Sequence, residues 1–344
     1  MRPSEPATPL RVGLVGAGRI ARTGILPAYA VAGIPLVAIC SKTRASAEEA
    51  AERWTGAGRV RVHADLEDLA ADPSVELIEV ATPPHDRLAM LRRLIAVGKP
   101  LLVHKPLAYD QEEAYRIVAE AEDAGVPIAV NHNARWWPVQ RILSAWLRNG
   151  DIGDVVHLAN VHHFSEDVRT WYTDREDYLF IEHGIHFLDL ARRYLGEPIS
   201  VAARAARVPG QQARCWLGYT VMLRFGGPEI ASLTLYNATR SPSAWDCHWF
   251  VNGTRADAHL TYSAATLYPG DGEAITERPE GTWIPDGLAA AYWSFVTALR
   301  TGGRPPHDAA DHLRTLALSA AATASARADG AWMDVSGSDL EHQT

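Results

Sequence analysis

The chain has 344 residues, too many for one hydrophobic core of ordinary size, so we expect two domains. Its net charge of -8 argues against a nucleic-acid partner and against an anionic membrane surface. No apolar run approaches the length needed to span a bilayer.

The N-terminus and the cysteines indicate a cytoplasmic protein. The opening residues, MRPSEPATPL, lack the apolar core of a secretory signal, and we interpret them as a short disordered lead-in. Cys40, Cys215 and Cys247 are far apart and never in CxxC spacing. This pattern favours a reducing compartment over a disulfide framework.

Up to residue 131, short apolar runs alternate with segments whose apolar residues have helical spacing. Strands are expected at Leu10–Val15, Pro35–Cys40, Glu76–Ala81, Leu101–His104 and Ile128–Asn131. Helices are expected between them, at Ile20–Ala32, Ala45–Trp54, Arg87–Val97 and Gln111–Ala124. Such alternation predicts an α/β domain with a doubly wound parallel sheet. The run ELIEVA is the weakest of these strand signals, because it is not uniformly apolar.

After residue 131 the pattern changes to strands without intervening helices. They are expected at Val155–Phe164, Ser200–Val208, Tyr219–Phe225, Glu229–Tyr236 and Trp245–Asn252. Helices are expected at Val139–Arg148, Glu182–Leu195, Leu288–Leu299 and Ala309–Ala328. This order predicts a largely antiparallel sheet. We therefore divide the chain into residues 1–131 and residues 132–344.

The first strand runs into a glycine loop, LRVGLVGAGRIA, and a helix follows directly. Gly16 and Gly18 form the G-x-G-x-x-A pattern with Ala21, and Arg19 and Ile20 lie between them. Gly16 permits a tight turn, and Gly18 lets the backbone approach a pyrophosphate at the helix N-terminus. The strand, loop and helix together predict a dinucleotide-binding site.

The residues after the second strand bear on the choice of cofactor. An acidic residue there would bind the ribose 2′-hydroxyl, but Ser41, Lys42 and Arg44 stand in its place. A hydroxyl and two cations suit a 2′-phosphate, so we predict NADP in preference to NAD. The alternative is that these residues are only a solvated helix start.

The segment LLVHKPL places a charge at the end of an apolar strand. Lys105 follows His104 and precedes Pro106. Ligands of open α/β sheets bind at the carboxyl ends of the strands. Lys105 is therefore a candidate catalyst, with a surface charge as the alternative.

Three further segments, taken with the glycine loop, carry a resemblance. They read ATPPHDRLAMLRRLIAVGKPLLVHKPLA, NHNARWWPVQRIL and FIEHGIHFLDLARRYLGEP. Together with the C-terminal helices they resemble the glucose-fructose oxidoreductase / inositol dehydrogenase / MocA family over nearly the whole chain. The resemblance implies a Rossmann domain followed by an α+β domain with an open, mostly antiparallel sheet. It also implies NAD- or NADP-dependent oxidation or reduction of a carbinol or carbonyl group on a sugar, cyclitol or related polyol.

By this resemblance, Lys105 and Pro106 match the family's E-K-P motif, and His104 replaces its glutamate. The lysine is expected to touch the reacting oxygen near the nicotinamide, and the bond before the proline is expected to be cis. His104 is also expected to line the cofactor. Losing the glutamate would remove a carboxylate from this region, which favours a lower pKa for Lys105.

The resemblance implies further cofactor contacts on two loops. Thr82 and Pro83 match a loop along the cofactor, where the family's histidine is absent. Arg87 occupies that histidine's place, and His85 is a nearby substitute. Asn133 and Arg135 match a turn near the nicotinamide.

The segment Glu182-His183-Gly184-Ile185-His186 matches the family's D-x-G-x-H. On a regular helix Glu182, His186 and Asp189 would form one stripe, in which a carboxylate supports an imidazole. His186 is then the expected general acid/base, with Lys105 stabilising the alkoxide. The alternative is a surface histidine in a carboxylate pair.

Aromatic residues are concentrated after residue 131, which suits stacking on a sugar. Trp171 and Tyr172 are therefore predicted, with Lys105, Glu182 and His186, to bind substrate. Core packing and subunit contacts are the alternative origin of these rings. The resemblance implies a homodimer or homotetramer.

Three rival functions stay open at this level. A zinc site would draw its imidazoles from His162, His163, His183 and His186, with Glu182 and Asp189 nearby, but adjacent strand residues point to opposite faces. A redox-assisted, glycoside-cleaving enzyme would use bound NAD transiently. A cofactor-binding sensor would need neither Lys105 nor His186.

Overall fold

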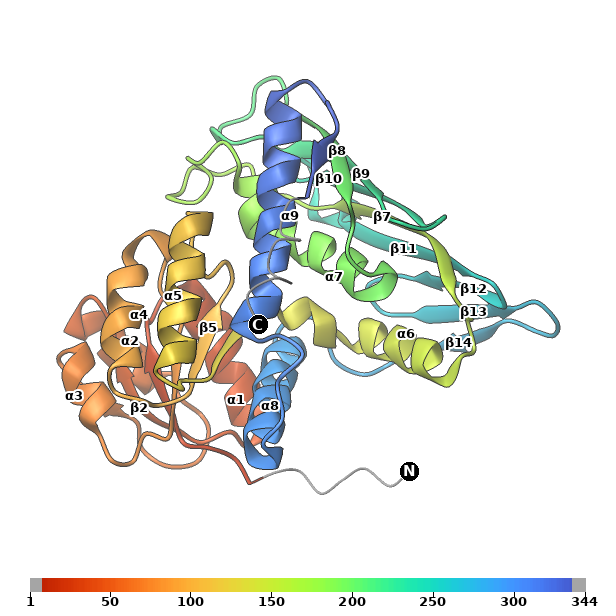
Figure 1. Cartoon of the computed structure of the whole chain (residues 1–344). Coiled ribbons are helices and arrows are strands. Elements are labelled where there is room, and N and C mark those ends of the chain that lie inside the picture. Colours follow the sequence, from red (N-terminus) through yellow and green to blue (C-terminus); the bar gives the residue numbers. More distant parts are fainter. Residues whose placement is uncertain (1–7, 336–344) are drawn as a thin grey trace. The chain divides into compact units, whose positions relative to one another are not determined.

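The computed structural model describes residues 8–335 (Figure 1). Most of the lead-in predicted at the N-terminus therefore lies outside the described residues. The chain forms two compact units. One contains the described residues up to Trp137 together with Trp283–Leu313, and the other contains Pro138–Thr282 and the described residues from Arg314 onward. Among the described residues, no helix has the length and apolar character needed to cross a membrane.

The first unit is built on a six-stranded parallel sheet. Its strands are β1 Val12–Val15, β2 Leu36–Cys40, β3 Arg61–Val62, β4 Leu77–Val80, β5 Leu101–His104 and β6 Ile128–Asn131. They lie in the order β3-β2-β1-β4-β5-β6, and every pairing is parallel. This order confirms the predicted doubly wound Rossmann sheet. The chain reverses direction across the sheet between β1 and β4, where such folds bind ligands.

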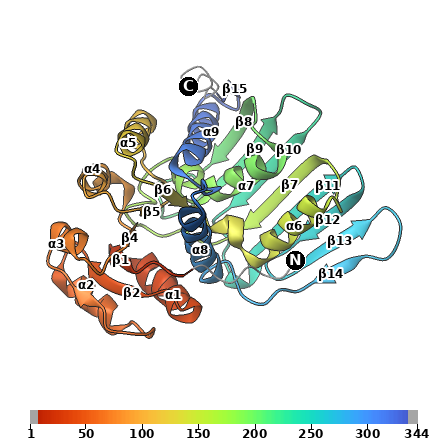
Figure 2. The same ribbon diagram turned by 60° about the horizontal axis from the view of Figure 1, so that its bottom comes forward.

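Helices cover both faces of this sheet. They are α1 Leu26–Ala32, α2 Arg44–Glu52, α3 Leu66–Ala71, α4 Leu88–Ile95, α5 Gln111–Asp123 and α8 Asp286–Thr301. Residues of α1, α2 and α8 share one hydrophobic core with β1, β2 and the central strands. Helices α1 and α8 lie side by side within that core (Figure 2).

The segment 283–313 packs with the parallel sheet although it follows the second sheet in the sequence. The Tyr292 hydroxyl accepts from the Leu10 backbone N–H at 2.7 Å and donates to the Leu10 carbonyl at 2.6 Å. The Trp283 ring stacks on Trp137 with 5.4 Å between centroids. The division predicted at residue 131 assigns residues 283–313 to the second domain. In the structure this segment belongs to the first compact unit.

The second unit is built on a nine-stranded sheet. Its strands are β7 Val155–His163, β8 Ser200–Ala206, β9 Gly218–Arg224, β10 Ile230–Tyr236, β11 Asp246–Gly253, β12 Ala256–Leu260, β13 Ala265–Pro269, β14 Ile275–Glu277 and β15 Met333–Asp334. The order is β14-β13-β12-β11-β7-β10-β9-β8-β15. Only the β7–β10 pairing among them is parallel, which confirms the open, mostly antiparallel sheet.

One face of this sheet is packed and the other is open. Helices α6 Pro138–Asn149 and α7 Ile185–Leu195, with most of α9 Ala309–Arg327, lie on the packed face (Figures 1 and 2). Along β9, Val221 and Leu223 are buried while Met222 and Arg224 between them are exposed. That alternation is the pattern of a sheet with one apolar face toward a core.

The structure differs from the sequence prediction at two helix starts. The helix predicted at Ile20–Ala32 contains a π-helical turn, Ala21–Ile25, before α1. The helix predicted at Glu182–Leu195 is also wrong in its first turn. Leu179–His183 form a π-helical turn, Gly184 interrupts it, and α7 begins at Ile185. The prediction also omitted the short elements β3, α3, β12, β13, β14 and β15.

Candidate functional site

The glycine loop is tied to the ends of two neighbouring strands. Gly16 has φ of 105°, a conformation that favours glycine. A Cβ there would lie 2.8 Å from the Ala81 carbonyl oxygen, just beyond β4. The Gly16 N–H donates to the Cys40 carbonyl at the end of β2, at 2.9 Å. Both the turn and its close packing therefore require glycine at this position.

The second glycine is not required by packing. A Cβ on Gly18 would meet no atom within 4 Å. Gly18, Arg19 and Ile20 lead into the helix, with Gly18 and Arg19 exposed and Ile20 packed against the core. The space beside Gly18 is what a backbone approach to a pyrophosphate needs, so the loop fits a dinucleotide.

The end of β2 carries the residues predicted to select the cofactor. The Ser41 hydroxyl accepts from the Ala17 N–H at 3.3 Å, so it is attached to the glycine loop. Lys42 is exposed. The Arg44 guanidinium is exposed and pairs with Glu48 at 2.7 Å, one turn along α2. Lys42 is thus accessible to a ligand, while Arg44 has a local partner that a 2′-phosphate would have to displace.

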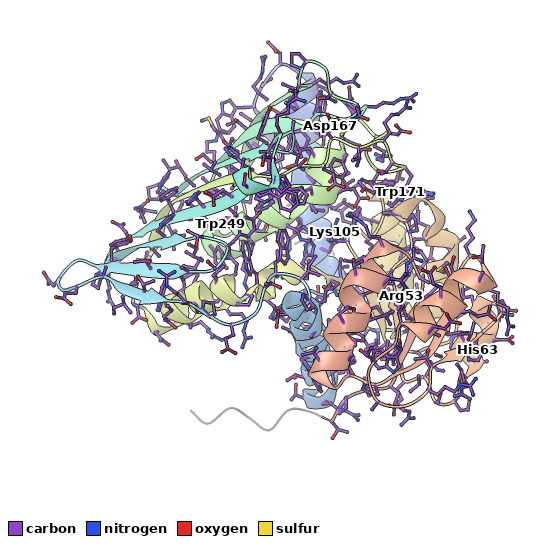
Figure 3. The ribbon with its side chains drawn as sticks, turned by 180° about the vertical axis from the view of Figure 1, so that it is seen from behind. Arg53, His63, Lys105, Asp167, Trp171 and Trp249 are labelled. Carbon is purple, nitrogen blue, oxygen red and sulfur yellow. The ribbon has the colours of Figure 1, made fainter. Side chains whose placement is uncertain are left out.

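Lys105 lies directly after β5, at the carboxyl edge of the parallel sheet (Figure 3). The peptide bond between Lys105 and Pro106 is cis, as predicted. Lysine occurs at only two other positions, Lys42 and Lys99. The Lys99 ammonium donates to the carbonyls of Ala70 and Asp72, away from this edge. Lys105 is therefore the lysine that the fold brings to the ligand-binding edge of β5.

The backbone on both sides of Lys105 is held by a buried arginine. Arg87 has 1 % of its surface exposed. Its guanidinium donates to the carbonyls of His104 and Pro106, which flank Lys105, and to the carbonyl of Thr82. A planar guanidinium supplies several donors in a fixed arrangement, which one ammonium group does not. Arg87 therefore joins the loop after β4 to the turn after β5.

A buried histidine pair holds the same turn from its other end. The Leu107 N–H donates to His312 Nε2 at 3.1 Å, so this nitrogen carries no proton. His312 Nδ1 lies 2.7 Å from His132 Nε2. Neutral His312 would then donate from Nδ1 to His132. Both histidines are fully buried.

His104 has a carboxylate partner that the sequence did not predict. Glu79, in the middle of β4, is fully buried, and its Oε1 lies 2.8 Å from His104 Nε2. Position 104 therefore has a carboxylate beside it, and the expectation that Lys105 lacks its usual carboxylate neighbour stays a prediction. The anion comes from the neighbouring strand.

The loops predicted along the cofactor occupy different environments. Thr82 and Pro83 are half-buried, and Thr82 Oγ1 lacks a hydrogen-bond partner within the described part of the chain. His85 is exposed on the turn that follows. Asn133 and Arg135 are buried in a 3-10 turn, where the Arg135 guanidinium binds Asp311 at 2.5 Å and the Pro306 carbonyl. These contacts give Arg135 a structural role.

In the second unit, Gly184 determines how the segment EHGIH folds. A Cβ on Gly184 would lie 2.3 Å from the Leu179 carbonyl oxygen and 2.5 Å from the Tyr219 hydroxyl. Glu182, in the π-helical turn, is half-buried, and His186, in the first turn of α7, is buried. The two residues are therefore not on one regular helix, and the predicted stripe through Asp189 is wrong.

Asp189 has other partners. It is fully buried, and its Oδ1 accepts from the Thr315 hydroxyl of α9 at 2.9 Å. Arg192 of the next helical turn lies 4.0 Å from the same oxygen. These contacts anchor α7 to α9.

The segment of His186 also contributes to a partly buried polar cluster that the sequence prediction did not assign to the catalytic site. His183 Nδ1 lies 2.6 Å from Asn237 Nδ2, and His162 Nε2 lies 2.7 Å from the Tyr262 hydroxyl. The His162 and His183 rings meet edge to face at 5.0 Å. Burial lowers the pKa of His162 to about 3, so this imidazole is neutral near pH 7.

The aromatic pair predicted to bind substrate is only partly accessible. Trp171 is 48 % exposed. The Tyr172 hydroxyl donates to Glu166 Oε1 at 2.6 Å, and its ring packs on Tyr178 at 5.4 Å. Trp171 is therefore about half exposed and meets the Tyr172 ring edge to face at 5.2 Å, while the tyrosine is part of a local network.

The described residues do not converge on a metal. Nowhere among them do three or more His, Cys, Asp or Glu side chains form a group able to hold an ion. The three cysteines are free and buried, and burial raises the pKa of each thiol to about 12.

Comparison with known proteins gives matches over both units. Residues 10–132 match the family described as "Oxidoreductase family, NAD-binding Rossmann fold", and residues 141–259 match "GFO/IDH/MocA C-terminal domain". A D-apiose dehydrogenase of Paraburkholderia graminis is 25% identical over 91% of this chain and 87% of its own length. An inositol 2-dehydrogenase of Rhizobium meliloti is 26% identical over 92% and 96%.

Solved structures share the fold. An oxidoreductase from Agrobacterium radiobacter, in complex with NAD+, L-tartaric acid and magnesium, has a TM-score of 0.83 and 22% identity over 95% of this chain and 99% of its own. A levoglucosan dehydrogenase in complex with NADH and L-sorbose has a TM-score of 0.83 and 19% identity over the same shares.

Proposed function

Because the chain belongs to the GFO/IDH/MocA oxidoreductase family, with its NAD-binding Rossmann fold, we propose that it acts on a sugar, cyclitol or related polyol. The reaction is hydride transfer between the nicotinamide and a carbinol or carbonyl carbon. The observation that carries the proposal is the placement of Lys105. It lies at the carboxyl edge of β5, on a turn whose backbone Arg87 holds on both sides.

The residues that would hold the dinucleotide lie around the switch point of the sheet. Gly16 and Gly18 form the loop for the pyrophosphate, with Arg19 and Ile20 opening the helix. Thr82, Pro83, His85, His104 and Asn133 are further proposed contacts, and Arg135 would act through the turn that it stabilises. When bound, the nicotinamide accepts or donates the hydride.

We assign the proton chemistry to Lys105 and His186. The Lys105 ammonium would stabilise the alkoxide that develops on the substrate oxygen. His186 would take the hydroxyl proton in oxidation and return it in reduction. Glu182 and Trp171 would contact the substrate, with Tyr172 supporting Trp171. The second unit, by this proposal, supplies substrate binding.

We further propose a preference for NADP over NAD. Ser41 and the exposed Lys42 follow β2 without an acidic residue to repel a 2′-phosphate. Fluorescence titration with NADPH and NADH measures the preference directly. Tighter binding of NADH would contradict it.

A second copy of the chain is the proposed partner of the open sheet face. Met222, Ser232, Ala159 and Phe250 form one row across four strands of that face. Met222 is 52% exposed and Phe250 42%. Association would remove these apolar side chains from water. The buried free thiols fit a reducing cytoplasm for such a homo-oligomer.

A panel of sugars and polyols tests the function. It includes D-apiose, inositol and levoglucosan with each oxidised cofactor, followed at the nicotinamide absorbance. We expect cofactor reduction with at least one compound, and a large loss of kcat in Lys105→Met with little change in cofactor affinity. Full activity in Lys105→Met would contradict the assignment. Substrate cleavage without net cofactor reduction would instead indicate the glycoside-cleaving route.

A further inference from the structure

A carboxylate lies buried in the centre of the parallel sheet. Glu79 is fully buried, and its strand neighbours are Leu14 on β1 and Leu102 on β5. A buried carboxylate without partners is strongly unfavourable. His104 Nε2, 2.8 Å from Glu79 Oε1, supplies the compensating contact.

This pair reaches the residue immediately before Lys105. His104 lies two residues after Leu102, so both side chains are on the face of β5 that carries Glu79. Glu79 holds the imidazole of His104, and Arg87 holds its carbonyl. The residue before Lys105 is therefore fixed through both its side chain and its backbone.

Glu79 also faces the helix that follows the glycine loop. Burial and then the charge of Glu79 raise the pKa of Tyr29, in α1, well above its ordinary value. The Tyr29 hydroxyl is thus protonated beside the carboxylate. Glu79 lies between the helix of the glycine loop and the turn of Lys105.

We propose that Glu79 and His104 are positioning residues for Lys105. The Glu79–His104 pair fixes the end of β5, so that the Lys105 side chain extends from the turn in one fixed direction. A catalytic group displaced by about 1 Å loses roughly a hundredfold in rate. The inference deepens the proposed function, and only its kinetic readout rests on that function.

The decisive variant replaces both partners by apolar residues. Glu79→Leu with His104→Leu leaves no unpaired buried charge, so we expect a folded protein of near wild-type Tm. A purely structural pair predicts wild-type behaviour in this double variant. A positioning pair predicts a kcat at least about ten times lower.

Lysine labelling gives a readout without a substrate. Lys42, Lys99 and Lys105 are the only lysines, so limited acetylation by acetic anhydride can be quantified at each by mass spectrometry. We expect the ratio of Lys105 to Lys42 labelling, measured against pH, to change at least threefold in the double variant, by about 0.7 kcal/mol or more. His104→Gln keeps a donor for Glu79 and should return the ratio toward wild type, whereas His104→Leu should not.

A second histidine–carboxylate pair provides the matched control. His63 Nε2 lies 3.0 Å from Asp72 Oδ2 in the same unit, and Figure 3 shows His63 well away from Lys105. His63→Leu should leave the Lys105 labelling ratio unchanged.

The outcomes separate the two proposals. An unchanged ratio in the double variant overturns the positioning role, whatever the turnover. A changed ratio in a protein that turns over no sugar or polyol supports positioning and contradicts the proposed function. If the double leucine variant does not fold, Glu79→Gln with His104→Leu removes both the charge and the contact while keeping the side-chain volume at position 79, and it gives the same comparison.

Discussion

Among single residues, lysine and arginine have distinct roles at the turn that follows β5. Lys105 places a compact ammonium at the end of β5, and the buried guanidinium of Arg87 binds three carbonyls around it. A guanidinium has five donors in a fixed plane, so it can bind several carbonyls at once. An ammonium is a compact point charge on a flexible side chain. Exchange of one for the other at either position should therefore be costly.

Arg87→Lys is expected to lower both stability and kcat. A compact ammonium cannot reproduce the spread of the guanidinium N–H groups, so at least one of the three carbonyls would lose its donor, at a cost of about 1–3 kcal/mol. Urea unfolding and steady-state kinetics measure the two effects. Arg93→Lys is the control, because Arg93 lies on α4, which begins directly after Arg87, and its pair with Glu67 is exposed. Equal stability of the two variants would contradict the role of Arg87 in holding the three carbonyls.

His162 makes stability depend on pH. Burial lowers its pKa to about 3, against an ordinary value of 6.5. Between these values the unfolded chain binds the extra proton, so the free energy of unfolding falls as pH drops from about 6.5 toward 3 and is unaffected above that window. At about 1.4 kcal/mol per pKa unit the contribution is several kcal/mol.

Urea unfolding at about pH 7 and about pH 4.5 checks this dependence. His162→Gln should be less sensitive to pH than wild type. Tyr262→Phe removes the hydrogen bond to His162 but keeps the buried imidazole, so it should lose about 1 kcal/mol and keep the wild-type slope. Identical slopes in wild type and His162→Gln would contradict the assignment.

At the scale of elements, the π-helical turn before α7 decides where the candidate acid/base residue stands. Gly184 allows Leu179–His183 to close against Tyr219, and His186 then falls in the first turn of a new helix. A regular helix from residue 182 would place Glu182 beneath His186 instead.

Gly184→Ala is expected to destabilise this junction. The new Cβ would meet the Leu179 carbonyl and the Tyr219 hydroxyl, so the backbone must shift at a cost of about 1–3 kcal/mol. Thermal unfolding measures the loss. Gly226→Ala is the matched control, since a Cβ there meets nothing within 4 Å. A Tm equal to that of Gly226→Ala would show that the junction tolerates a side chain.

At the scale of the whole molecule, the open face of the nine-stranded sheet predicts assembly. Met222→Asp with Phe250→Asp should convert a homo-oligomer into monomers, because two charges would be buried at the interface. Sedimentation velocity measures the change. Val31→Asp, at an exposed position on α1, is the control and should leave the assembly intact. An unchanged oligomer in the double variant would place the interface elsewhere.

Only some residues of the candidate site could be predicted from the sequence. The glycine loop and Lys105 were found because each follows a strand whose apolar pattern is plain. Glu79 was indicated only weakly, as the acidic residue in the interior of the run ELIEVA. Arg87 was noticed only as a departure from a family pattern, and His312 left no signal. Their roles depend on contacts between residues far apart in the sequence, which local spacing does not encode.

By itself, the sequence determined the doubly wound parallel sheet, the mostly antiparallel second sheet, the nucleotide loop and the position of Lys105. Hydrophobic periodicity and turn chemistry act over a few residues, so residues close together in the sequence determine these features. Only the tertiary structure decided that the segment 283–313 packs on the first sheet, that α7 starts at Ile185, and that Glu79, Arg87 and His312 surround the Lys105 turn. Those outcomes follow from burial and hydrogen bonding between distant segments, which exist only once the chain is folded.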